Sequence, residues 1–138
     1  MQYKLKKGKF FHHLITSFLL IILAPLLVLL DLFVELYHHV GFPLCGMRLV
    51  NRSAYVVIDR HRLQYLNAFD KAACAYCGYA NGLFAYWREI GGLTESYWCA
   101  IKHQRKPGRK EQSHQKDFLA YGDRDGFEKK FGRTREKK

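Results

Sequence analysis

An uncharged apolar run near the N-terminus constrains this chain more than any other feature. Residues 10–30 contain no Asp, Glu, Lys or Arg over 21 positions, and only Thr16, Ser17 and Pro25 are not apolar within residues 14–30. A helix of about 20 residues spans roughly 30 Å of hydrocarbon, so the run is just long enough to cross a bilayer. A chain of 138 residues has little core in which to bury such a helix. The sequence therefore predicts attachment to a membrane.

The way in which the run meets the membrane has alternatives. A cleavable signal peptide would also begin with basic residues, but no small-residue cleavage pattern follows Leu30. Pro25 is able to break the run into two short helices that enter and leave on one side. The lysines before residue 10 favour a cytoplasmic location for the N-terminus. The cysteines of the downstream domain favour a cytoplasmic location for that domain as well, because thiols stay reduced there. We expect a single membrane helix or a Pro-broken helical hairpin, with the downstream domain on the cytoplasmic face.

Four residues farther along have the spacing of a metal site. Cys74 and Cys77 form a Cys-x-x-Cys pair, which in a tight turn holds one ion between two thiolates. Cys99 and His103 are four residues apart, so on a helix both side chains would leave the same face. We expect a tetrahedral Cys3His site with structural zinc, and iron is the alternative metal. Disulfide pairing is the competing interpretation, and Cys45 is a possible substitute ligand.

A second candidate site lies where the apolar run ends. Its four polar residues fall within about a 100° arc of a helix and are Asp31, Glu35, His38 and His39. The Glu-x-x-His step is the type used in carboxylate di-iron bundles, so these residues are weak candidates for a second metal site. Glu35, His38 and His39 are also weak catalytic candidates. Alternatively, the four groups pair with one another and with Arg48 or Arg52, and simply end the span.

An Asp-Arg-His-Arg sequence supplies the remaining weak catalytic candidates, Asp59 and His61. Its alternating charges suit an anionic group such as a lipid phosphate, and salt bridging is the alternative. The sequence contains no pattern of a hydrolase triad, a Gly-rich nucleotide loop or a zincin. Catalysis is therefore the less favoured interpretation.

The composition divides the chain into four segments. Residues 1–9 form a basic lead, residues 10–40 the membrane helix or hairpin, residues 41–103 a compact Cys3His metal domain, and residues 104–138 a basic, partly disordered tail. The tail has 12 Lys and Arg against 6 Asp and Glu, within a net charge of +11. A basic chain tethered to a membrane meets anionic lipid headgroups first, so nucleic acid is the less favoured partner.

The expected fold class is mostly α, with a small metal-knuckle domain and a minor β element. The β-branched residues 54–58 predict a strand. A helix is predicted from Asn81 or Gly82 to Ile90, with a break at residues 91–92. Thr94 is then expected to cap a second helix that continues past residue 103.

Three motifs resemble a family of small bacterial membrane proteins of unassigned function. They lie in residues 55–67, in Cys-Ala-Tyr-Cys-Gly-Tyr-Ala-Asn-Gly at 74–82, and in Tyr-Trp-Cys-Ala-Ile-Lys-His at 97–103. This resemblance implies a bacterial inner-membrane location and no particular activity. Separately, residues 74–79 resemble one half of a rubredoxin site. The second Cys-x-x-Cys of a rubredoxin is replaced here by the Cys99/His103 pair, which favours structural zinc over iron.

Together these features predict a membrane-anchored metal-binding protein that acts as an interaction or assembly module for a protein partner in the membrane. The first alternative is a membrane-surface redox or metal-dependent enzyme, with iron at the Cys site or at the second candidate site. This second site, here called the Asp31 cluster, consists of Asp31, Glu35, His38 and His39. The second is binding of nucleic acid or anionic lipid through the basic tail.

Overall fold

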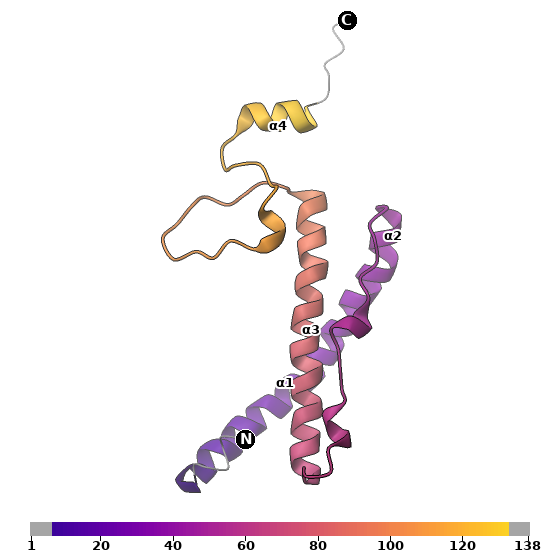
Figure 1. Ribbon diagram of the computed structural model, residues 1–138, viewed down its shortest axis with the longest axis vertical. Coiled ribbons are helices and arrows are strands. Elements are labelled where there is room, and N and C mark those ends of the chain that lie inside the picture. Colours follow the sequence, from indigo (N-terminus) through magenta and orange to yellow (C-terminus); the bar gives the residue numbers. More distant parts are fainter. Residues whose placement is uncertain (1–6, 133–138) are drawn as a thin grey trace, which may run out of the picture. The chain divides into compact units, whose positions relative to one another are not determined.

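The computed structural model describes residues 7–132 (Figure 1). The chain divides into two compact units, Met1–Trp87 and Arg88–Lys138. The described part is mostly helical, as predicted. Residues 1–6 of the predicted basic lead and residues 133–138 of the predicted tail lie outside the described residues. The long helix α3 (Ala68–Trp98) is shared by the two units.

A single long helix begins the first unit. The 3-10 turn η2 (Lys7–Lys9) leads into α1 (Phe10–Leu36), which continues through the π-helical turn η3 (Tyr37–Gly41) into α2 (Phe42–Leu44). Pro25 lies inside α1 without ending it, so the helical-hairpin alternative is wrong. A proline removes only one backbone hydrogen bond, and the bonds of the surrounding turns hold the helix together.

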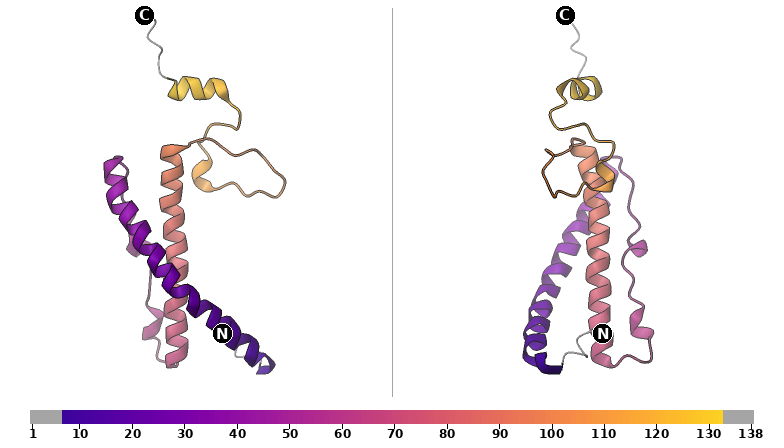
Figure 2. Two further views of the ribbon diagram at one scale, coloured as in Figure 1. Left: turned by 180° about the vertical axis from the view of Figure 1, so that it is seen from behind. Right: turned by 60° about the vertical axis from the view of Figure 1, so that its left-hand side comes forward.

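Residues 46–67, here called the strap, run back along α3 (Figures 1 and 2). The strap contains the 3-10 turns η4 (Arg52–Ala54) and η5 (Arg60–Arg62). The strand predicted at residues 54–58 is absent, and the described residues contain no named strand. A strand needs a neighbouring strand for its ladder, whereas this backbone lies against a helix.

Helix α3 (Ala68–Trp98) is longer than the sequence predicted. It begins after Asn67, whose side-chain oxygen accepts the N–H of Asp70 at 2.8 Å as an N-cap. Helix α3 continues through residues 91–92, so the predicted break there is wrong. A glycine lowers helix stability by only about 1 kcal/mol, and the long flanking turns compensate for it.

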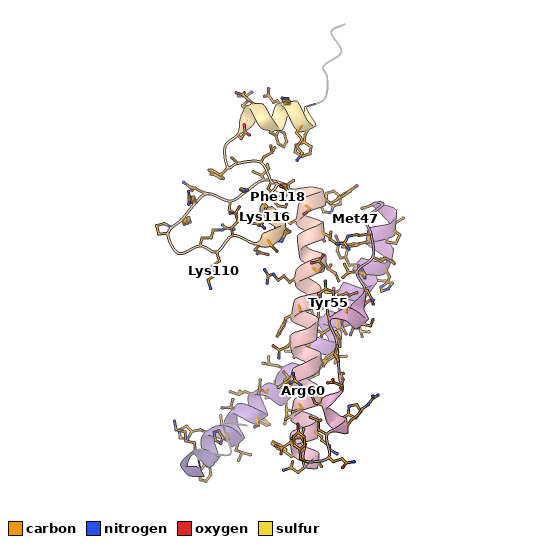
Figure 3. The ribbon with its side chains drawn as sticks, in the orientation of Figure 1. Met47, Tyr55, Arg60, Lys110, Lys116 and Phe118 are labelled. Carbon is orange, nitrogen blue, oxygen red and sulfur yellow. The ribbon has the colours of Figure 1, made fainter. Side chains whose placement is uncertain are left out.

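Two glycines of α3 explain why the strap lies so close to the helix. A Cβ on Gly82 would stand 2.7 Å from the carbonyl oxygen of Tyr55 and from the Cα of Val56. A Cβ on Gly78 would stand 2.9 Å from the carbonyl oxygen of Val57. Figure 3 shows Tyr55 beside α3 at this contact. Glycines four residues apart thus form the groove that receives the strap backbone.

The second unit starts with the last turns of α3 and ends with α4 (Arg124–Phe131). The chain leaves α3 at Cys99, makes an isolated parallel bridge between Ile101 and Leu119, and includes the 3-10 turn η6 (Ser113–Gln115). Gly92 faces the ring of His114, whose Nδ1 would lie 3.0 Å from an added Cβ. This glycine therefore provides room for a side chain and does not end the helix.

Candidate functional site

The four polar residues predicted at the end of the apolar run do share one region, at the junction of α1 and η3. Asp31 and His38 are buried, whereas Glu35 is half-buried and His39 is exposed. The 3.6-residue helical repeat places positions 31, 35 and 38 on one face, as the spacing predicted. This face meets the strap and α3 within the first unit.

Arg52 of the strap neutralises the two carboxylates. Its Nη1 and Nη2 donate to Oδ1 and Oδ2 of Asp31, both at 2.7 Å, and Nη1 also lies 2.6 Å from Oε1 of Glu35. The parallel pair of bonds to Asp31 is the bidentate geometry that a guanidinium favours. Hydrogen bonding to Asp31 raises the pKa of Arg52 further above its already high value, so this side chain stays charged. The pairing of the cluster with Arg52 is one of the alternatives that the sequence predicted.

Tyr79 of α3 completes the environment of Asp31. Its hydroxyl donates to Oδ2 of Asp31 at 2.8 Å. Burial, with a further contribution from this hydrogen bond, raises the pKa of Tyr79 above its ordinary value of 10.0. The hydroxyl therefore keeps its proton and acts as a donor to the carboxylate.

His38 uses both ring nitrogens inside the protein. Nε2 accepts the backbone N–H of Val50 at 2.9 Å, and Nδ1 lies 2.9 Å from the hydroxyl of Tyr86. Because an accepting Nε2 carries no proton, Nδ1 carries it and donates to the Tyr86 oxygen. Burial, and then the charge of Glu35, raise the pKa of Tyr86 to about 12, so the hydroxyl also remains protonated. The geometry thus describes a neutral histidine with one tautomer.

Glu35, His38 and His39 form the group of possible metal ligands in the part of the chain that is described. Their ligand atoms lie within 4.8 Å of one another. Each atom is already engaged, because His39 Nδ1 lies 3.0 Å from Oε2 of Glu35 and both nitrogens of His38 are hydrogen-bonded. Binding a metal through Nδ1 of His38 would move the proton to Nε2, where it would face the N–H of Val50. The cluster is therefore better suited to hold the fold together than to bind an ion.

The predicted cysteine site has a different local structure from the one expected. Cys74 and Cys77 lie one turn apart within α3 and not in a tight knuckle turn. Cys99 comes directly after α3 and His103 lies in the segment beyond it, so these two residues do not share a helix. All four cysteines, including Cys45, are free thiols.

The two halves of the predicted Cys3His site belong to different units. Cys74 and Cys77 are in the first unit, and Cys99 and His103 are in the second. The four-ligand site accordingly stays a prediction from the sequence. Within the second unit, Nε2 of His103 lies 3.8 Å from Oε1 of Glu95.

The weak candidates Asp59 and His61 are exposed at η5. Asp59 precedes this turn without capping it by a side-chain hydrogen bond. Among the described residues, neither belongs to a group of three close ligand atoms. The structure thus does not bring them to the Asp31 cluster.

Sequence reasoning missed the two tyrosines that complete the cluster. Tyr79 and Tyr86 are seven residues apart, a spacing that places them on one face of a helix. This spacing was a usable signal, but it required α3 to be continuous through Gly82.

Comparison of the chain with protein-family models, with curated proteins and with solved structures finds no match. The resemblance of its motifs to small bacterial membrane proteins therefore stays a prediction.

Proposed function

We propose that this protein is a membrane-anchored, non-catalytic module that presents its second unit to partners at the membrane surface. The observation that carries the proposal is the helix Phe11–Leu44, which is long and apolar enough to cross a membrane. Only 6% of its most apolar window is buried. The side chains of a core helix would be covered by the protein, whereas these are exposed and suit a hydrocarbon environment.

The Asp31 cluster supports a structural role for the polar end of this helix. Carboxylates near hydrocarbon are costly unless paired, and Arg52 supplies the partner from the strap. The hydrogen bonds of Tyr79 and His38 then tie the same end to α3 and to the strap. The cluster would join the anchor to the rest of the first unit, and its occupied donors and acceptors leave little for catalysis.

From the sequence alone we further propose a bacterial inner membrane, a cytoplasmic location of the domain, structural zinc at the cysteines, and a protein partner in the membrane.

Fractionation of cells that produce the full chain tests the anchor. We expect the chain to stay with the membranes after an alkaline carbonate wash. Replacement of Ile22 by Arg should release it, because a cation at the centre of a span costs about 3 kcal/mol. The matched control is Leu49→Arg, which places the same charge on an exposed residue of the strap.

Two results would overturn the proposal. One is release of the unaltered chain by carbonate. The other is an intact mass that lacks the apolar run, which would identify the run as a cleaved signal peptide.

A further inference from the structure

A closed basic loop in the second unit has no part in the proposed anchor. The loop leaves α3 and returns where Ile101 and Leu119 form their bridge. The N–H of Lys102 donates to the carbonyl of Leu119 at 2.8 Å, and the N–H of Leu119 donates to the carbonyl of Ala100 at 2.9 Å. These bonds join the two ends of the loop, whose course can be followed in Figure 3.

Residues of the loop line a pocket of about 590 Å³, which is within the usual range for small-molecule sites. Its lining contains four cationic side chains and one carboxylate, and Tyr121 closes part of the wall. The charged lining residues are Lys102, Arg105, Lys106, Arg109 and Glu111.

The single carboxylate leaves most of this positive charge uncompensated. Glu111 Oε1 lies 2.9 Å from Nζ of Lys102, and this hydrogen bond lowers the pKa of Glu111. Within the described residues, Arg105, Lys106 and Arg109 form no ion pair. Arg105 and Arg109 contribute with Lys102 to the lowered pKa of Glu111, but four cations and one carboxylate still leave the lining strongly positive, and a bound anion would offset this charge.

We propose that this pocket binds a phosphate group that carries at least two negative charges. A group with a single charge would leave two of the three cations uncompensated. Guanidinium groups also donate in a planar fork that matches phosphate oxygens, and the pocket offers two of them, from Arg105 and Arg109. The same chemistry is present in a phosphomonoester lipid headgroup and in a free pyrophosphate group.

The inference is independent of the proposed anchor, because every residue of the pocket lies in the second unit. A chain that carbonate releases from membranes would still be expected to bind a soluble phosphate. Failure of the anchor and failure of the pocket can therefore be told apart.

The first arm of the test is calorimetric titration of the full chain in neutral detergent micelles with inorganic pyrophosphate. Replacing Arg105 and Arg109 together by Gln should raise the dissociation constant at least about ten-fold, since charge-assisted hydrogen bonds to phosphate are lost. The control is Lys129→Gln with Lys130→Gln, which removes the same charge from α4 outside the pocket.

Two matched single substitutions distinguish the loss of a binding contact from unfolding of the loop. Lys106→Gln should weaken binding, whereas Lys110→Gln should leave it unchanged, because Lys110 does not line the pocket. In Figure 3 its side chain points away from the loop. Equal far-ultraviolet circular dichroism would establish that both variants are folded.

The second arm distinguishes a lipid from a free phosphate. The full chain is placed in phosphatidylcholine nanodiscs that contain phosphatidic acid, or phosphatidylglycerol at equal surface charge, and amide exchange is followed over residues 102–121. Protection by phosphatidic acid alone, lost in the Arg105/Arg109 variant, would indicate a lipid headgroup. Pyrophosphate binding without lipid protection would indicate a free ligand.

Either of two results would overturn the proposal. The first is that neither pyrophosphate nor phosphatidic acid binds. The second is that the α4 control loses as much affinity as the pocket variant, which would mean diffuse attraction to a basic surface.

Discussion

The ring of His38 accepts the backbone N–H of Val50 at 2.9 Å, across a separation of 12 residues. His38 is completely buried, and the hydrogen bond fastens the start of the strap to the end of the apolar helix. The other ring nitrogen is bonded to Tyr86 of α3. One neutral side chain thus joins all three parts of the first unit.

Replacing His38 by Phe should destabilise the first unit by about 2 kcal/mol or more. The N–H of Val50 and the hydroxyl of Tyr86 would both be buried without this partner, and each unsatisfied group costs about 1–3 kcal/mol. Thermal unfolding in mild detergent measures the loss. The neighbouring His39→Phe is the control, because its side chain is 58% exposed and should change stability little. Equal melting temperatures for the two variants would contradict the role of His38.

Loss of the Arg52 side chain should leave two carboxylates without their cation. Removing one partner of a fully buried pair costs about 3–5 kcal/mol. We expect about 2 kcal/mol for Arg52→Met, because the arginine side chain is 33% exposed and water screens part of the charge. Arg60→Met removes an exposed charge from the same strap and should be nearly neutral. A similar effect of both substitutions on thermal unfolding would show that the pairing contributes nothing.

Two glycine substitutions in one helix should have opposite effects. Gly82→Ala places a Cβ 2.7 Å from strap backbone, which cannot move without displacing the strap, so we expect a loss of about 1–3 kcal/mol. Gly91→Ala meets no atom within 4 Å and should stabilise α3 by up to about 1 kcal/mol. Denaturant or thermal unfolding of both variants makes the comparison. A harmless Gly82→Ala would rule out the close approach of the strap.

The second unit should weaken in acid through Glu95. Nε2 of His114 lies 2.6 Å from Oε2 of Glu95, and this hydrogen bond lowers the pKa of the carboxyl from its ordinary value of 4.5. A carboxyl with a lowered folded-state pKa stabilises the fold above its ordinary pKa, and this contribution disappears as the pH falls through the lowered value.

Amide exchange in the second unit, followed from neutral pH to below 4.5, measures this loss. Glu95→Gln should reduce the acid sensitivity, because the amide does not titrate in this range. Glu128→Gln changes an exposed carboxyl on α4 and serves as the control. An acid response that is the same in all three proteins would argue against the Glu95–His114 contact.

The cysteine prediction is tested by metal content. We expect one zinc per chain in the purified protein, absent from Cys74→Ser and retained in Cys45→Ser, whereas loss of zinc in Cys45→Ser would identify Cys45 as the substitute ligand. Iron with a thiolate absorption band would favour the redox alternative. A purified chain without metal would remove the Cys3His prediction.

Local sequence was sufficient to predict the apolar helix and the common face of Asp31, Glu35 and His38. Both follow from the composition and the helical repeat over neighbouring residues, which operate without reference to the rest of the chain. Pairing of the carboxylates with an arginine is one of two interpretations that the sequence allows, and a metal site is the other. A sequence shows the charges but not their separation.

The errors arose where distant residues decide the local structure. Gly78 and Gly82 favour a turn by propensity, but in the fold they are the places where the strap backbone approaches α3. Residues 54–58 have strand composition, yet no second strand lies beside them to share hydrogen bonds. Gly92 favours a break in the helix by propensity, whereas in the fold it provides space for the ring of His114.

The sequence by itself determined a long apolar helix, a basic second half and a polar face at the end of that helix, since each of these depends on residues close together in the chain. Only the tertiary structure decided that the strap lies on the glycines of α3, and that His38 is a neutral, fully bonded side chain. It also decided which cations line one pocket. These properties depend on which backbone and side-chain groups, tens of residues apart, come within hydrogen-bonding or van der Waals distance.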